Sequence, residues 1–194
     1  NWMKRMATYT LEENLRDANL LADMLRSLNY MPKPTIARVQ GPAYGGGVGL
    51  VACCDMAVAS PAASFCLSEV KVGMIPATIS PYVVRAIGER ASRRYFTTAE
   101  VIIAEQALQL GLISELIAED QLDDAINNII KTILRNGPRA VGEAKRLVFD
   151  VADCEVSDSL LAETSKRIAE TRSSDEGREG LLAFLEKRKP AWIQ

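Results

Sequence analysis

The sequence of 194 residues lacks histidine altogether and carries a formal net charge of only −2. The absence of histidine excludes Ser–His and Cys–His nucleophilic catalysis and the usual zinc sites. Acid–base chemistry at neutral pH therefore falls to carboxylates, lysine, tyrosine or cysteine. The small net charge argues against nucleic acid as the main partner. No apolar run approaches the roughly 18 residues of a membrane span and no signal-peptide pattern opens the chain, so we expect a cytosolic protein without a membrane partner.

The four cysteines do not indicate a metal site or a disulfide framework. Cys53 and Cys54 are adjacent in an expected helix and point to different faces, so they suit neither a metal pair nor a disulfide. Cys66 and Cys154 stand singly in apolar surroundings. We interpret all four as small buried hydrophobic residues, and we expect no metal.

Apolar periodicity and breaking residues divide the chain into a mixed part and a helical part. We expect strands at 35–39, 56–59, 64–67 and 113–116, and helices at 10–30, 47–54, 80–87, 92–96, 104–110, 119–136, 139–153, 157–172 and 177–187. Thr10 and Glu13 resemble a capping box at the start of the first helix. Because strands and helices alternate only up to residue 117, we predict an α/β core over 1–117 and a helical region over 118–194.

The segment from Pro34 to Asp55 is the most informative part of the chain. A β-branched run leads through a turn into Gly45-Gly46-Gly47 and then into a helix. Glycines at such a junction let the backbone approach a ligand, and the free N–H groups favour an anion, either a phosphate or a reacting carbonyl oxygen. Residues 47–52 fit a relaxed dinucleotide fingerprint, but its acidic residue, Glu69, comes one segment too late. A third interpretation is that the glycines serve tight packing only.

Four segments, in the same order, resemble the crotonase (enoyl-CoA hydratase/isomerase) superfamily. They are 36–55, 64–76, 107–113 and 175–190, and together they cover nearly the whole chain. The resemblance implies a spiral core of β-β-α turns and a C-terminal helical region that makes contacts in a homotrimer or a dimer of trimers. It also implies an acyl-CoA substrate, with coenzyme A as part of the substrate and no separate cofactor.

The resemblance assigns roles to residues of the glycine segment and the loop after it. Gly46 is expected to donate its backbone N–H to the thioester oxygen, with Gly45, Gly47 and Gly49 beside the substrate. Glu69 is expected to move a proton to or from the carbon α to the thioester. Without the resemblance, Glu69 would be interpreted as a surface glutamate.

Two residues near the C-terminus complete the implied site. Phe184 and Lys187 are expected at the adenine and phosphate end of coenzyme A. Their alternatives are a core phenylalanine and a solvated lysine.

Gly49 departs from the family pattern, because family hydratases typically carry the first of two glutamates there. Three possibilities follow: a hydratase with one carboxylate, a double-bond isomerase that uses Glu69 alone, and a member that has lost catalysis. A structural or RNA-associated member is a further class. The glycine segment and the Glu69 loop most resemble methylglutaconyl-CoA hydratase-like members of leucine breakdown. We expect Gly49 to leave room for a branched or carboxylated acyl group.

The first residues resemble a segment that is internal in the family. Asn1-Trp2-Met3 is similar to the residues just after the family's first oxyanion-hole segment. We therefore expect these 194 residues to be part of a longer crotonase, inactive alone and with exposed sheet edges.

Overall fold

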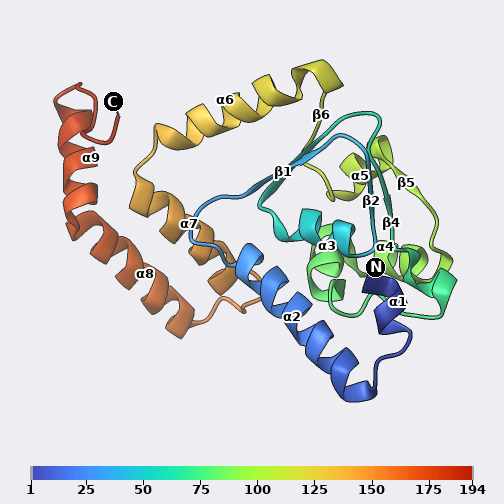
Figure 1. Ribbon diagram of the computed structural model, residues 1–194. Coiled ribbons are helices and arrows are strands. Elements are labelled where there is room, and N and C mark those ends of the chain that lie inside the picture. Colours follow the sequence, from blue (N-terminus) through green and yellow to red (C-terminus); the bar gives the residue numbers. More distant parts are fainter. Residues whose placement is uncertain (1, 194) are drawn as a thin grey trace. The chain divides into compact units, whose positions relative to one another are not determined.

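The computed structural model describes residues 2–193, so that Asn1 lies outside the described residues. These residues form two compact units (Figure 1). Unit 1 contains the chain up to Met31 and Thr35–Ile126, and unit 2 contains Pro32–Pro34 and the chain from Asn127 onward. The sequence predicts a boundary after residue 117, before helix α6 (Leu122–Leu134). In the structure the boundary along the chain falls inside this helix, between Ile126 and Asn127.

Unit 1 holds two three-stranded sheets built from short strands. In the first sheet all pairs are parallel, in the order β1 (Ile36–Val39), β3 (Met56–Ala59) and β6 (Glu115–Leu116). In the second sheet β2 (Pro42–Tyr44) is parallel to β4 (Ser64–Cys66), which is antiparallel to β5 (Ile102–Ile103). The sequence predicts β1, β3, β4 and β6 but misses β2 and β5.

The helices of unit 1 follow the predicted order with two differences. They are α1 (Trp2–Met6), α2 (Leu11–Asn29), α3 (Gly46–Cys53), α4 (Ser80–Thr98) and α5 (Ala104–Leu110), with 3₁₀ turns η1 (Ser68–Val72) and η2 (Glu119–Gln121). The predicted capping box is present, because the Thr10 hydroxyl accepts from the Glu13 N–H at 3.2 Å and the Glu13 carboxylate accepts from the Thr10 N–H at 2.7 Å. Helix α1 is not predicted, and the helices predicted at 80–87 and 92–96 are one element that kinks at Gly88 (φ 78°).

Polar and apolar contacts hold the unit 1 sheets. The Asp55 carboxylate accepts from the N–H and hydroxyl of Thr35 at 2.7 and 3.0 Å, which fixes the start of β1 beside the start of β3. Burial of apolar side chains between the sheets and helices supplies the main driving force. The largest fully buried side chains include Phe65, Leu25, Leu67, Ile79, Ile102, Leu122, Val48, Val58 and Val83.

Unit 2 is helical, as predicted. It contains the second half of α6 together with α7 (Pro138–Val151), α8 (Asp158–Ser173) and α9 (Asp175–Leu185). The Glu176 carboxylate of α9 accepts from the N–H groups of Arg139 and Ala140 at 3.0 and 2.8 Å, so it caps the first turn of α7. Across residues 2–193, no helix combines the length and apolarity needed to cross a membrane.

Candidate active site

The turn before α3 depends on Gly45. Gly45 has φ 53° and ψ −121°, a conformation that residues with a side chain rarely adopt. Its N–H donates to the Cys66 carbonyl at 2.8 Å, and this bond joins the end of β2 to the end of β4. The Gly45 N–H is therefore already used. The place of Gly45 beside a substrate stays a prediction, and its role in the turn is to shape the backbone.

The next two glycines leave their N–H groups free. Among residues 2–193, neither Gly46 nor Gly47 has an acceptor for its N–H, whereas the Val48 N–H donates to the Gly45 carbonyl at 3.0 Å. Gly46 is exposed, and a Cβ added to it would meet no atom within 4 Å. Free N–H groups at the start of a helix favour a negatively charged oxygen. The first turn of α3 is thus open to such an atom.

Glu69 lies against this turn although it follows in a different segment. It belongs to η1, and its Oε1 is 3.3 Å from the position that a Cβ on Gly45 would take. Its Oε2 is buried and has no hydrogen-bond partner among the described residues. The Met74 N–H donates to the Glu69 carbonyl at 3.0 Å and so closes the loop. The structure therefore brings the predicted acid and the predicted oxyanion donor together.

The room expected at Gly49 does not exist. Gly49 is buried in α3, and a Cβ there would lie 2.2 Å from Ile79 Cγ2 and 2.8 Å from Ile79 Cβ. Leu25 Cδ2 lies 3.6 Å away on the other side. Gly49 is required because neighbouring side chains fill its surroundings, and the expectation that it accommodates a branched acyl group is wrong. The sequence did not indicate a role for Ile79. The one feature that could have suggested a tightly packed neighbour is the glycine at position 49 within an apolar helix.

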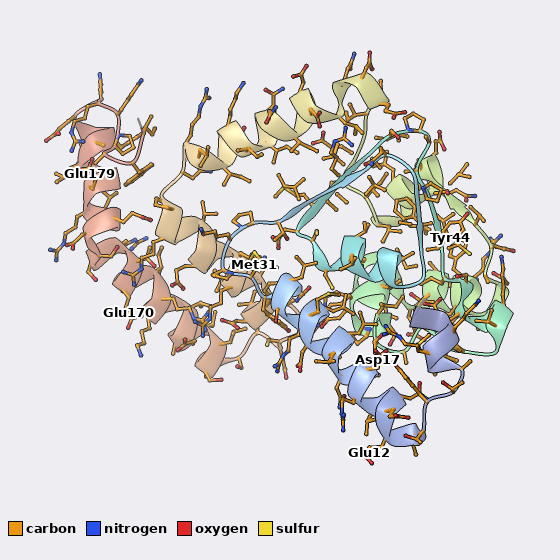
Figure 2. All side chains as sticks on the ribbon, in the orientation of Figure 1. Glu12, Asp17, Met31, Tyr44, Glu170 and Glu179 are labelled. Carbon is orange, nitrogen blue, oxygen red and sulfur yellow. The ribbon has the colours of Figure 1, made fainter. Side chains whose placement is uncertain are left out.

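Exposed apolar side chains precede the glycine turn and follow Glu69 in the sequence. Tyr44 stands at the end of β2, immediately before the glycine turn, and 49% of its surface is exposed (Figure 2). Val72, Met74 and Ile75 follow Glu69 and are also exposed. Exposed apolar side chains of this kind suit the hydrocarbon part of an acyl group.

The remaining predicted residues lie in unit 2 or are structural. Phe184 of α9 is 81% exposed, so the alternative of a core phenylalanine is wrong. Lys187, just after α9, is exposed and has φ 55°. Both residues belong to unit 2, and their place at the coenzyme A end stays a prediction.

The cysteines provide no further site. Cys53 and Cys66 are buried as expected and Cys54 is half-buried, but Cys154 is exposed, which contradicts its interpretation as a core residue. Among the described residues there is no cluster of acidic or cysteine side chains that could hold a metal ion.

Free N–H groups at a helix start with one carboxylate beside them define a class of site. Such a site stabilises a negatively charged carbonyl oxygen and moves a proton at the neighbouring carbon. Comparison with known proteins identifies the family. Residues 3–194 match the enoyl-CoA hydratase/isomerase family, and the chain belongs to it.

Individual relatives agree with this assignment. An enoyl-CoA hydratase structure from Shewanella pealeana is 49% identical, with a TM-score of 0.95, over 99% of this chain and 72% of that one. AtuE of Pseudomonas aeruginosa is 33% identical, with a TM-score of 0.93, over 99% of this chain and 74% of that one. The short-chain-enoyl-CoA hydratase of Clostridium acetobutylicum is 32% identical, and the match spans 86% of this chain and 64% of that protein. The predicted crotonase-like α/β fold is thereby confirmed.

Proposed function

We propose that the protein acts on acyl-CoA thioesters through an enolate-like intermediate, and that it hydrates an enoyl-CoA. One observation carries this proposal: the Glu69 carboxylate lies against Gly45, immediately before the free N–H groups of Gly46 and Gly47. The thioester oxygen accepts from the Gly46 N–H, and the dipole of α3 adds to its stabilisation. A donor of this kind typically supplies about 2.7–4 kcal/mol of transition-state stabilisation.

Hydration of the double bond requires both a proton transfer and stabilisation of the thioester oxygen. The oxygen of water bonds to the β-carbon as one of its protons passes to the Glu69 carboxylate, the electron pair of the carbon–carbon double bond moves toward the thioester oxygen, and the resulting enolate takes a proton from Glu69 at its α-carbon. Glu69 is the group that carries the proton, because its Oε2 has no partner among the described residues and is shielded from bulk water. No cofactor other than the coenzyme A of the substrate takes part.

Double-bond isomerisation is the second candidate, and the Gly49 surroundings favour it. Position 49 is glycine and Ile79 fills the space beside it, so α3 carries no second carboxylate beside Glu69. Isomerisation needs one group that removes a proton from one carbon and returns it to another, and Glu69 suffices for both steps.

The finer assignments rest on the sequence resemblance. We propose a methylglutaconyl-type enoyl-CoA of leucine breakdown as the first substrate to assay, with Phe184 and Lys187 at the coenzyme A end. We also propose a homotrimer or a dimer of trimers and a cytosolic location. Comparing residues 1–194 with the product of the complete coding sequence tests whether this chain alone has activity.

Replacement of Glu69 by glutamine tests the proposal. Glu69→Gln keeps the shape of the side chain but removes its acid–base function, so we expect turnover to fall at least about a hundredfold. The assay follows hydration of crotonyl-CoA and 3-methylglutaconyl-CoA, and α-proton exchange in deuterium oxide. Glu89→Gln, an exposed glutamate paired with Arg93 on α4, is the matched control.

Two results would contradict the proposal. Glu69→Gln with the turnover of the parent would remove Glu69 from the mechanism. A parent that catalyses neither reaction but binds RNA in a salt-dependent gel-shift assay would support the RNA-associated alternative instead.

A further inference from the structure

Three positions at the start of α3 and along it have surroundings that become more apolar from the first to the third. Gly45, Gly49 and Cys53 follow at intervals of four residues, about one helical turn each. The Glu69 carboxylate lies over the first position and Ile79 lies over the second. The third, Cys53, is buried, and burial raises the pKa of its thiol to about 12. The third of these positions therefore belongs to the hydrophobic core.

Ile79 is held firmly in this place. Its carbonyl accepts from the N–H groups of Tyr82 and Val83, both at 3.1 Å, so it anchors the first turn of α4. Its side chain is 1% exposed. Leu25 and Val83, both fully buried, belong to the same hydrophobic core. The buried position of Ile79 therefore opposes any movement that would admit a larger residue at position 49.

A side chain at position 49 would otherwise enter the site. In an α-helix the Cα–Cβ bond tilts toward the N-terminus, so a glutamate at 49 would reach back toward Gly45 and the Glu69 carboxylate. Ile79, with Cγ2 at 2.2 Å and Cβ at 2.8 Å from the required Cβ position, prevents this.

We infer that Ile79 is a specificity-determining residue, because it excludes a second side chain from α3 and so limits the site to the single carboxylate of Glu69. The inference rests on the proposed function and adds to it a reason why hydration has to proceed with Glu69 as the single carboxylate. With one carboxylate, α-proton exchange at the thioester proceeds readily, whereas the attacking water has no second carboxylate to orient it. Exchange should therefore be fast relative to hydration of a straight-chain enoyl-CoA.

Thermal unfolding tests the steric part. We expect Gly49→Ala to lower the melting temperature by about 5 °C, because overpacking of this kind has a measurable cost in stability. The same change should cost as much in an Ile79→Val background, since valine keeps Cγ2 and Cβ. It should cost little in an Ile79→Gly background, and glycine is well tolerated at the N-cap position that Ile79 occupies. Equal costs in all three backgrounds would overturn the inference.

The catalytic part is tested by a compensated pair in the protein made from its complete coding sequence. Gly49→Glu combined with Ile79→Gly should raise the ratio of crotonyl-CoA hydration to α-proton exchange by at least about tenfold over Ile79→Gly alone. An unchanged ratio in a folded double variant would overturn the inference while the proposed function stands. A parent with neither reaction would contradict the proposed function, and the inference would be lost with it.

Discussion

The two units of the molecule are stabilised in different ways. Of the buried apolar side chains among the described residues, all but Ala183 belong to unit 1. Unit 2 instead has charged and polar contacts within and between its helices. Glu176 caps α7, Arg167 pairs with Asp150 and Glu163, and Glu179 binds Arg188 through both carboxylate oxygens, at 2.6 and 2.9 Å.

The two units therefore differ in the size of their apolar core and in how many large apolar side chains they expose. Unit 1 has a dense core that can hold a glycine turn and a partly buried carboxylate in fixed positions. Unit 2 has little core and leaves large apolar side chains of α9 uncovered, namely Leu181, Leu182, Phe184 and Leu185. The comparison predicts that truncating a large side chain is costly in unit 1 and nearly free in unit 2.

Two phenylalanines provide the strongest test. Phe65 of β4 is fully buried, so Phe65→Ala should lower the free energy of unfolding by about 3–5 kcal/mol. Phe184 of α9 is 81% exposed, so Phe184→Ala should change it by less than about 0.5 kcal/mol. Denaturant titration followed by circular dichroism measures both. Equal losses would refute the contrast between the units.

Gly46 tests the glycine turn of unit 1. Gly46→Pro removes the N–H, but proline suits the first position of a helix and no hydrogen bond is lost. We expect kcat to fall about 10²–10³-fold while the fold and coenzyme A binding persist. Gly46→Ala keeps the N–H, and its Cβ meets no atom within 4 Å, so it is the matched control. If the two variants are equally active, the thioester oxygen is bound elsewhere.

The Glu176 cap tests how far unit 2 depends on polar contacts. Glu176→Ala removes the acceptor of two N–H groups of α7, and we expect a loss of about 1 kcal/mol in the free energy of unfolding. Glu170→Ala, an exposed glutamate of α8 (Figure 2), is the control. A loss no greater than that of the control would show that the cap contributes nothing.

Glu179 provides the smallest expected effect, a dependence on pH. The hydrogen bonds from Arg188 and the Ala191 N–H lower the pKa of the Glu179 carboxyl to about 2. A lowered folded-state pKa stabilises the fold above the ordinary value of about 4.3, and this stability is lost as the pH falls toward 2. The melting temperature of Glu179→Gln should therefore lie below that of the parent near neutral pH, and the difference should shrink at acid pH. A constant difference would mean that ionisation of Glu179 is irrelevant.

Local chemistry explains what the sequence could predict. The Thr10–Glu13 capping box and the break at Gly137-Pro138 depend on neighbouring residues, and both are where the sequence places them. Strands β2 and β5 are only three and two residues long and exist because each pairs with β4. The residues Pro42-Ala43-Tyr44 alone do not predict such a pairing.

The candidate site also has a part that the sequence could predict and a part that it could not. The glycine turn and Glu69 carry a recognisable pattern, and the structure brings them together, although their roles in catalysis stay predictions. The surroundings of Gly49 could not be predicted. A glycine in a helix signals equally well an opening or a tight contact, and only the packing of α4 against α3 shows that Ile79 fills the space.

The hydrogen bond from the Gly45 N–H to the Cys66 carbonyl has a mechanical consequence. Strand β4 holds the start of α3 through this bond, and the same strand leads directly into the turn that carries Glu69. Any displacement of β4 would thus carry the N–H donors and the carboxylate in the same direction. Their mutual spacing would survive vibrations and small distortions of the sheet, whereas their spacing to groups on other strands would not.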